Sequence, residues 1–444
     1  MTVVKPFRGV RYNPARVEQM QQVVSQPYDR IDSALQQQYY DLSPYNIVRV
    51  IQDRSEPGDQ PEGSNVYTRA RDHYRQWLQE GVLMREEQPA FYAYEQRFTI
   101  GGQSYTRLGL IAAVQLVEFD QGVILPHERT HSGPKEDRLR LLRTLEANTE
   151  QIFLLYPDPE NRVNALIRQA INGRESDIDV VEIWESDVRQ RVWVIRDPAT
   201  LQAIEAEMAP KRHLIIADGH HRYETGLNYR NEQRASHPDA PDNAAFNFVA
   251  ATLVSMDDPG LVILPTHREI ANFGKNSPST ILERAKDYFA VQAAPDLAAC
   301  LRTLNESDAS QAFGFYGGQD VGFHVLTLRD DDLIDRLITG DQSHEWKTLG
   351  VSVLHRILLD QIAEVPAHGI EDKTMIRYHR DPQAAVQSVD HGSGNFVFFV
   401  RPTRMANVKA IAQHGEKMPQ KSTDFYPKVI SGLTLLPLGP EERL

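Results

Sequence analysis

The densest group of ionisable residues in the chain is ADGHHR, at residues 217–222. An apolar run, LII, precedes it and predicts a short strand, while Asp218-Gly219 predicts a tight turn. HHRYETGLNYRNEQ then predicts a helix whose first turn holds His220, His221 and Arg222. The backbone N–H groups at a helix start lack partners within the helix, and the helix dipole is positive there. This junction is therefore expected to favour an anion such as phosphate.

Three residues of this junction suit phosphate binding. Gly219 lets the backbone approach a ligand, Arg222 offers a bidentate contact, and Asp218 is a candidate ligand for a ribose hydroxyl or a magnesium ion. Successive helical residues point about 100° apart, so His220 and His221 cannot both face one ligand. The alternative is a plain turn before a helix with solvated histidines. The P-loop pattern GxxxxGK[ST] is absent.

A second group of ionisable residues lies in PHERTHSGPKEDRL, at residues 126–139. His127, Glu128 and His131 have the spacing HExxH, which on a helix would bind zinc with the glutamate as general base. Pro126 before the motif and Ser-Gly-Pro after it argue against a helix here. A metal site that also uses His220 is kept as a minor alternative.

Read as a loop, the same stretch suits phosphate chemistry better. It offers Glu128, Lys135 and Arg138 just before an apolar helical pattern, although a solvated loop of mixed charge would have the same composition. Two further segments contain candidates for phosphate or substrate-carboxylate contacts: LPTHR and MPQKSTDFYPK. Their candidate residues are His267, Arg268, Lys421, Ser422, Thr423, Tyr426 and Lys428. An exposed polar loop explains the second segment equally well.

The elements that would position these residues are both helices and hairpins. Apolar residues at helical spacing predict helices over 64–81, from 137, from 350 and from 403, with Ser64 and Gly81 capping the first. Strand-like runs joined by short Gly-containing turns predict hairpins at 90–119 and 313–328. Hairpins this frequent exclude a purely parallel sheet, so the expected fold class is α+β with a mixed sheet.

Length and composition restrict the remaining possibilities. A chain of 444 residues predicts two or three domains, and the polar stretch NFGKNSPS places a boundary between 1–271 and 272–444. A net charge of -13 argues against nucleic acid as a partner. The single cysteine, Cys300, and the lack of a long apolar run predict a cytoplasmic protein without a membrane span.

Seven motifs together resemble a prokaryotic family called domain of unknown function number 1015. They are, in chain order, PFRGVRYN, QPYDRI, PHERTHSGPKEDRL, IFLLYPDP, ADGHHRYET, LPTHR and GEKMPQKSTDFYPKVISGL. The ADGHHR segment is also similar to the phosphate-binding motif of the ParB and sulfiredoxin superfamily. This resemblance implies a ParB/sulfiredoxin-like core with large additions, and an N-terminal domain that carries the nucleotide site.

Free-serine kinases of that superfamily have a similar DGHHR stretch after a segment containing PHE, at a shorter interval than here. The resemblance implies that Glu128 is the catalytic base, that Asp218 to Arg222 bind the nucleotide phosphates with His220 near the reaction, and that Mg²⁺ with ATP or ADP is the cofactor. The expected function is a small-molecule kinase, or a phosphohydrolase in the reverse sense, acting on a hydroxylated metabolite. A ParB-like nucleotide-binding regulator and a metal-dependent hydrolase are the alternatives. The sequence is compatible with a homo-oligomer.

Overall fold

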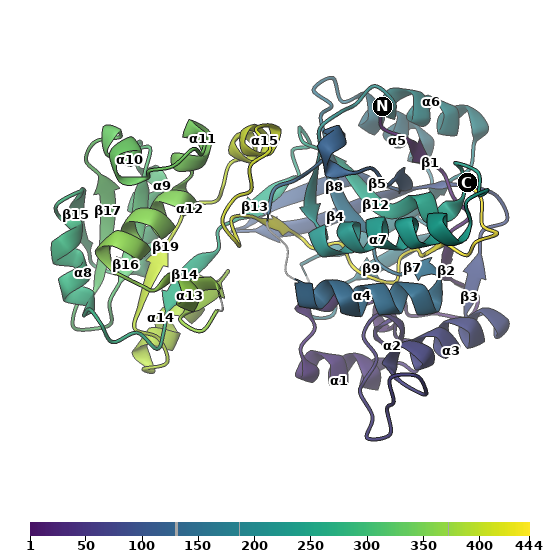
Figure 1. Ribbon diagram of the computed structural model, residues 1–444, viewed down its shortest axis with the longest axis horizontal. Coiled ribbons are helices and arrows are strands. Elements are labelled where there is room, and N and C mark those ends of the chain that lie inside the picture. The colour runs from purple at the N-terminus through teal and green to yellow at the C-terminus, as the bar shows by residue number, and fades with distance from the viewer. Residues whose placement is uncertain (129–131, 186, 372) are drawn as a thin grey trace. The chain divides into compact units, whose positions relative to one another are not determined.

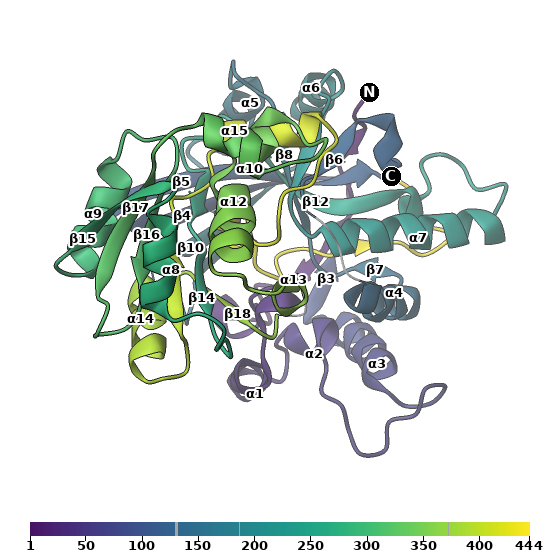
Figure 2. The same ribbon diagram turned by 60° about the vertical axis from the view of Figure 1, so that its left-hand side comes forward.

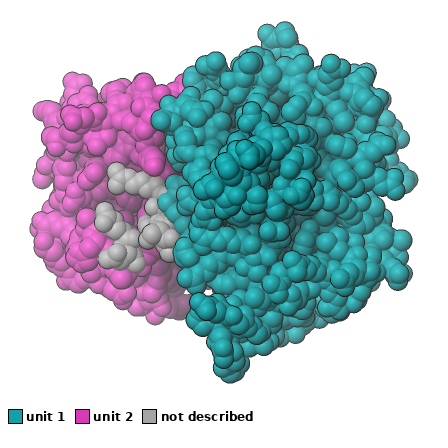
Figure 3. Space-filling model, turned by 45° about the vertical axis from the view of Figure 1, so that its right-hand side comes forward, with its two compact units in different colours: residues 1–126, 130–262, 427–444 teal, residues 127–129, 263–426 magenta. Residues whose placement is uncertain are grey.

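The computed structural model describes residues 1–128, 132–185, 187–371 and 373–444, which form two compact units (Figure 3). Unit 1 comprises residues 1–126, 130–262 and 427–444, and unit 2 comprises residues 127–129 and 263–426. The chain thus leaves unit 1 after residue 262 and returns to it after residue 426. The sequence instead predicted a single boundary, between residues 271 and 272. The polar stretch NFGKNSPS leads into a helix of unit 2. The side chain of Ser277 caps the start of that helix.

Unit 1 is built on a mixed sheet, which in the described residues has nine strands. Their order is β6-β11-β8-β12-β5-β4-β10-β9, with β1 pairing along β5. The pairs β6–β11 and β8–β12 are parallel, and the other pairs are antiparallel. The strands are β1 (Val4–Lys5), β4 (Phe91–Ile100), β5 (Gln103–Gln115), β6 (Ile124–Pro126), β8 (Ile152–Tyr156), β9 (Ile178–Val181), β10 (Arg189–Ile195), β11 (Leu214–Asp218) and β12 (Phe248–Ser255).

Helices pack around this sheet, and two short strand pairs complete the unit. α4 and α7 lie side by side, as both ribbon views show (Figures 1 and 2). The helices are α1 (Ser33–Leu42), α2 (Val48–Ile51), α3 (Val66–Gln79), α4 (Ser132–Leu145), α5 (Arg162–Ile171), α6 (Pro198–Met208) and α7 (His220–Ser236). The short pairs are β2 (Val10–Tyr12) with β3 (Leu83–Arg85), and β7 (Ala147–Asn148) with β21 (Leu436–Pro437).

The core of unit 1 explains why β11 and α7 are held firmly. Leu214 and Ile216 of β11 are fully buried in one apolar cluster with Tyr223 and Leu227 of α7. Burying a side chain of this size stabilises the fold by roughly 1.5–3 kcal/mol. The junction between strand and helix is therefore anchored on both sides by core residues.

Unit 2 is built on a six-stranded, wholly antiparallel sheet, of order β15-β17-β16-β19-β14-β18. The strands are β14 (His267–Ile270), β15 (Phe289–Ala294), β16 (Ala312–Tyr316), β17 (Phe323–Leu328), β18 (Ile376–His379) and β19 (Phe396–Phe399), and β13 (Val262–Leu264) pairs separately with β20 (Asp424–Tyr426). The helices are α8 (Pro278–Ala285), α9 (Leu297–Glu306), α10 (Asp332–Leu337), α11 (His344–Lys347), α12 (Gly350–Val353), α13 (Ala367–Glu371), α14 (Pro382–Asp390) and α15 (Met405–Gln413).

The predicted α+β class with a mixed sheet is confirmed, and so are both hairpins, β4–β5 and β16–β17. The predicted helix over 64–81 is α3, but Asn65 caps it in place of Ser64, through a capping box with Thr68. The helix predicted from Gly350 is α12 followed by a π-helix, Leu354–Ile362. No helix in the described ranges is both long and apolar enough to span a membrane.

Candidate functional site

The junction between β11 and α7 has the predicted strand, turn and helix start. β11 ends at Asp218, where its pairing with β8 shifts register, so that Asp218 lies opposite Phe153 and Ile216 opposite Leu154. Such an irregularity re-aims the side chain that follows it. The Gly219 N–H donates to the Asp218 carboxylate over 2.7 Å, and α7 begins at the next residue.

Gly219 is needed here for two separate reasons. Its backbone has φ +89°, which side-chain-bearing residues rarely adopt. A Cβ atom at this position would also lie 3.0–3.1 Å from the guanidinium of Arg222, which folds back over the turn. The glycine therefore allows the arginine to lie directly against the start of the helix.

Asp218 is paired with two cations. Its Oδ2 accepts a hydrogen bond from Lys428 Nζ over 3.0 Å, and its Oδ1 lies 3.6 Å from the Arg222 guanidinium. Burial alone would raise the pKa of Asp218, but the charges of Lys428 and Arg222 and the lysine hydrogen bond hold it well below its usual range. Asp218 is therefore a carboxylate, and it fixes the position of two cations at the start of α7.

Arg222 is also held from its other side. Its Nη1 donates to the Gln151 carbonyl oxygen over 2.6 Å. Burial lowers the pKa of Arg222, and the charges of Glu150 and Asp218 outweigh this and raise it. The Glu150 carboxylate accepts from the Tyr28 backbone N–H over 3.0 Å. Glu150 and Gln151 directly precede the strand IFLLY. Neither of them was predicted from the sequence as a site residue.

Arg138 and Lys135 of α4, both predicted as site residues, contact residues close to this junction. Arg138 packs its guanidinium 4.3 Å from the centre of the Tyr28 ring and lies 3.9 Å from Glu150. Lys135 forms an ion pair with Glu224 of α7. His220 is buried and His221 is half-buried. The two histidines therefore differ in environment, as expected for adjacent residues of a helix, whose side chains point in different directions.

Glu128 belongs to unit 2, where it lies beside the segment 418–426. Glu128 and Met418 form an isolated parallel β-bridge, in which the Met418 backbone N–H donates to the His127 carbonyl oxygen over 2.9 Å. The Thr423 hydroxyl donates to the Glu128 carboxylate over 3.4 Å and lies 2.9 Å from His127 Nε2. Glu128 and the segment at residues 421–423, both predicted as parts of the site, are therefore neighbours. Glu128 keeps 23% of its side chain exposed.

Other predicted residues of unit 2 have structural contacts. Burial and the charge of Arg268 lower the pKa of His267 to about 4, and its ring Nδ1 accepts from the Val400 N–H over 3.3 Å. Arg268 is buried, which lowers its pKa to about 10, and it donates to the carbonyl oxygen of Lys421 over 2.8 Å. The Ser422 hydroxyl donates to the Pro419 carbonyl oxygen over 2.6 Å.

Two predicted residues of the C-terminal segment remain more open. Lys421 is exposed and has φ +57°, while the ring of Tyr426 lies 4.9 Å below the Arg380 guanidinium. Lys428, five residues after Thr423, returns to unit 1 and pairs with Asp218. The segment thus contributes residues to both units.

The zinc alternative has little support in the described residues. His127 and Glu128 lie in no helix there, and His131 falls outside the residues that the structure describes. No group of three or more His, Cys, Asp or Glu side chains suited to a metal ion occurs among the residues described. As a magnesium ligand, Asp218 would act as a single carboxylate already shared with Lys428.

These observations define an α+β protein with a highly charged strand-to-helix junction. The chain belongs to the family described as "Protein of unknown function (DUF1015)", whose model matches residues 4–352. Six of the seven motifs lie in that range, and the seventh, at residues 415–433, lies beyond it. No curated protein proved similar to the chain.

Several solved structures match this chain at low sequence identity. A conserved hypothetical protein from Pyrococcus furiosus is 13% identical, with 71% of this chain and 94% of that chain covered and a TM-score of 0.33. Free serine kinase in complex with AMP is 14% identical, with 71% and 90% covered and a TM-score of 0.32. C-terminally truncated SbnI from Staphylococcus aureus is 10% identical, with 74% and 87% covered and a TM-score of 0.35.

Proposed function

We propose that this protein is a nucleotide-dependent phosphotransferase that phosphorylates the hydroxyl group of a small metabolite. The observation that carries the proposal is the start of α7, where Arg222 and Lys428 both lie against Asp218. Two fixed cations beside the positive end of a helix dipole suit the phosphates of a nucleotide. The ADGHHR motif, similar to that of free-serine kinases, supports the same assignment.

The role of Asp218 in this proposal is to prepare the site before the nucleotide arrives. Phosphoryl transfer depends mainly on positioning and on neutralising charge, with little covalent chemistry for the protein to perform. A carboxylate that already holds Arg222 and Lys428 in place reduces the reorganisation needed when phosphates bind. A magnesium ion bound with the nucleotide would supply further neutralisation of the phosphate charge, with Asp218 as its one protein carboxylate.

Glu128 is assigned the role of proton acceptor for the substrate hydroxyl. The hydroxyl proton passes to its carboxylate as the hydroxyl oxygen bonds to the terminal phosphorus and the bond to the leaving nucleotide breaks. The hydrogen bond from Thr423 orients the carboxylate, and its partial exposure leaves it accessible to a substrate. Its match to the acidic residue of the kinase motif supports this role.

The second candidate is a nucleotide-binding regulator without catalysis. It is favoured by the placement of His267 and Arg268, which were expected to contact substrate but are buried and bonded to the backbone of unit 2. This leaves fewer charged groups to recognise an acceptor. Nucleotide binding is common to both candidates, and turnover separates them.

Thermal-shift measurements with ATP, ADP and CTP, each with magnesium, test the shared step. We expect at least one nucleotide to raise the melting temperature. Arg222→Ala should weaken that nucleotide roughly 10–100-fold, the loss of about 1.5–3 kcal/mol expected for a charged hydrogen bond. The matched control is Arg143→Ala, because Arg143 is an exposed α4 residue paired with Glu232. The absence of any nucleotide shift would exclude both candidates.

Phosphorus NMR with a panel of amino and hydroxy acids then distinguishes the two. A phosphotransferase consumes the nucleotide only when an acceptor is present and forms a new phosphoester signal. Glu128→Gln should abolish this signal while the thermal shift with nucleotide persists. A wild-type protein that binds nucleotide but forms no phosphoester with any acceptor would instead be a regulator.

A further inference from the structure

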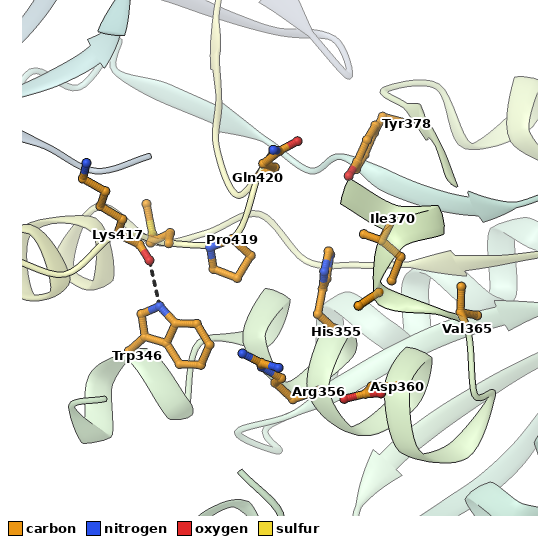
Figure 4. A pocket seen from close by; sticks show the side chains of 12 residues that line it. Trp346, His355, Arg356, Asp360, Val365, Ile370, Tyr378, Lys417, Pro419 and Gln420 are labelled. Carbon is orange, nitrogen blue, oxygen red and sulfur yellow. Dashed lines mark hydrogen bonds between the residues drawn. The ribbon is translucent and has the colours of Figure 1, made fainter. Parts of the chain in front are cut away.

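A cavity inside unit 2 has no role in the function proposed above. It has a volume of about 210 Å³ and lies between the π-helix Leu354–Ile362, α13 and the segment 417–420 (Figure 4). Every residue that lines it belongs to unit 2. A cavity of this size is smaller than the pockets of about 300–1,000 Å³ that hold drug-sized ligands, so it would suit a small metabolite.

Two polar atoms in the walls of this cavity lack partners. Among the described residues, neither His355 Nε2 nor Tyr378 Oη has a hydrogen-bond partner, although both atoms are buried. Leaving such a group unsatisfied costs roughly 1–3 kcal/mol, and most buried polar groups are therefore bonded. Two such atoms in residues that line one cavity are candidate hydrogen-bond partners for a bound molecule.

The charges around the cavity favour an anion. Burial, together with the charges of Arg268 and Arg356, lowers the pKa of His355 to about 3, so its imidazole is neutral. Arg356 also lines the cavity, and its charge and that of Arg268 both act on His355, against the single lining carboxylate of Asp360. The amine of the exposed Lys417 points away from the other lining side chains (Figure 4). A ligand with one negative charge would balance this excess of positive charge.

Most of the remaining lining is apolar and includes a fixed aromatic ring. Trp346 Nε1 donates to the Lys417 carbonyl oxygen over 2.9 Å, which holds the indole in place (Figure 4). Val365, Ile370 and Pro419 add aliphatic surface. An aromatic or branched aliphatic group would bury its surface here.

The π-helix that carries His355 is a second indication of a binding site. A single helical pattern from residue 350 predicts a regular α-helix, yet the described chain widens to the π form at 354–362. Such π segments are rare and occur frequently at functional sites. Here the π-helix presents both His355 and Asp360 to the cavity.

We propose that this cavity binds a small organic carboxylate with an apolar body. The carboxylate would accept hydrogen bonds from His355 Nε2 and Tyr378 Oη, and the apolar body would pack against Trp346. None of the residues proposed to contact the carboxylate has a role in the phosphotransferase assignment, although Met418, which also lines the cavity, forms a β-bridge with Glu128. Carboxylate binding is therefore measured separately from nucleotide binding and turnover.

Benzoate, phenylacetate and isovalerate are suitable probes, with benzamide as an uncharged control of the same shape as benzoate. We expect at least one carboxylate to give saturation-transfer NMR signals with the full chain at concentrations on the order of 10 mM, where millimolar dissociation constants are detected. Benzamide should bind more weakly than benzoate. No binding by any of the three carboxylates, or equal binding of benzoate and benzamide, would overturn the proposal.

Variants locate the binding site. Tyr378→Phe removes one buried oxygen and keeps the ring, so it should fold and weaken the carboxylate roughly 5–30-fold. His355→Ala should weaken it at least as much, and His391→Ala, at an exposed histidine of unit 2, should leave it unchanged. If His355→Ala does not fold, Tyr378→Phe decides alone. Binding that survives Tyr378→Phe undiminished contradicts the proposal.

Discussion

Lys428 Nζ lies 3.0 Å from the Asp218 carboxylate, although 210 residues separate the two in the chain. The backbone carbonyl oxygen of Lys428 also accepts a hydrogen bond from the Gln96 side chain over 2.9 Å, within the same unit. The segment from residue 427 onward is therefore an integral part of unit 1. It brings a lysine to a junction whose Asp218, Gly219 and Arg222 are neighbours in the sequence.

Lys428→Met should destabilise the protein and weaken nucleotide binding. It leaves Asp218, with 20% of its side chain exposed, without its closest cation, at a cost of about 1–3 kcal/mol at neutral pH. Urea denaturation measures this cost. Lys211→Met is the control, because Lys211 lies 3.0 Å from Asp158 elsewhere in unit 1. It should lower stability similarly and leave nucleotide binding intact; equal loss of binding in both variants would assign the effect to stability alone.

The contribution of this ion pair should depend on pH. The folded-state pKa of Asp218 lies below the unfolded value of about 3.9, so the pair stabilises fully above that value. This stability is lost as the pH falls through the folded pKa. The difference in unfolding free energy between the wild type and Lys428→Met should therefore be constant near neutral pH and shrink in acid. A difference that persists unchanged in acid would show that the ion pair does not cause it.

Gly219→Ala should disturb the junction more than a positive φ alone explains. A left-handed conformation costs a residue with a side chain roughly 1–2 kcal/mol, and the new methyl group would also displace the Arg222 guanidinium. Gly173→Ala isolates the first effect, since Gly173 has φ +72° and no atom within 4 Å of the place that a methyl group would take. Both variants should lose stability, but only Gly219→Ala should lose nucleotide affinity. Equal affinities in the two variants would mean that Arg222 does not contact the nucleotide.

Glu182 should make the protein less stable as pH rises. Burial, with a smaller effect from the charge of Glu185, raises the pKa of Glu182 to about 8, against about 4.3 when unfolded. Between these values the folded state holds a proton that the unfolded state has released, so the unfolding free energy falls with increasing pH. Glu182→Gln should flatten that fall, and Glu160→Gln, at an exposed glutamate, should not. Denaturation curves across this pH range test it.

Magnesium should matter only in the presence of nucleotide. No cluster of three or more acidic, histidine or cysteine ligands occurs in the part of the chain that the structure describes, so the ion should arrive with the phosphates. EDTA should reduce the thermal shift produced by ATP or ADP and leave the melting temperature of the protein alone unchanged. A magnesium-dependent shift without nucleotide would point to a separate metal site.

The local part of the fold and of the site could be predicted from the sequence. The β4–β5 hairpin follows from the glycine pair at 101–102, and the β11–α7 junction follows from an apolar run, an Asp-Gly turn and a helical pattern. Each of these signals lies within about 30 residues, where turn chemistry and periodicity act directly.

The long-range part could not be predicted. The parallel pairing of β6 with β11 and the contact of Lys428 with Asp218 join segments that share no local signal. His267 and Arg268 were predicted to contact phosphate or substrate, yet β14 lies between β18 and β19 and both residues are buried. The π-helix was also missed, because its residues have the apolar spacing of an ordinary helix.

The 210-residue separation of Asp218 and Lys428 also has a consequence for protein synthesis. A ribosome adds about 5–20 residues per second, so Lys428 is made about 10–40 s after Asp218. Throughout that interval β11 and α7 can fold, but the carboxylate lacks its lysine partner. A growing chain should therefore be unable to bind nucleotide fully until Lys428 has been made.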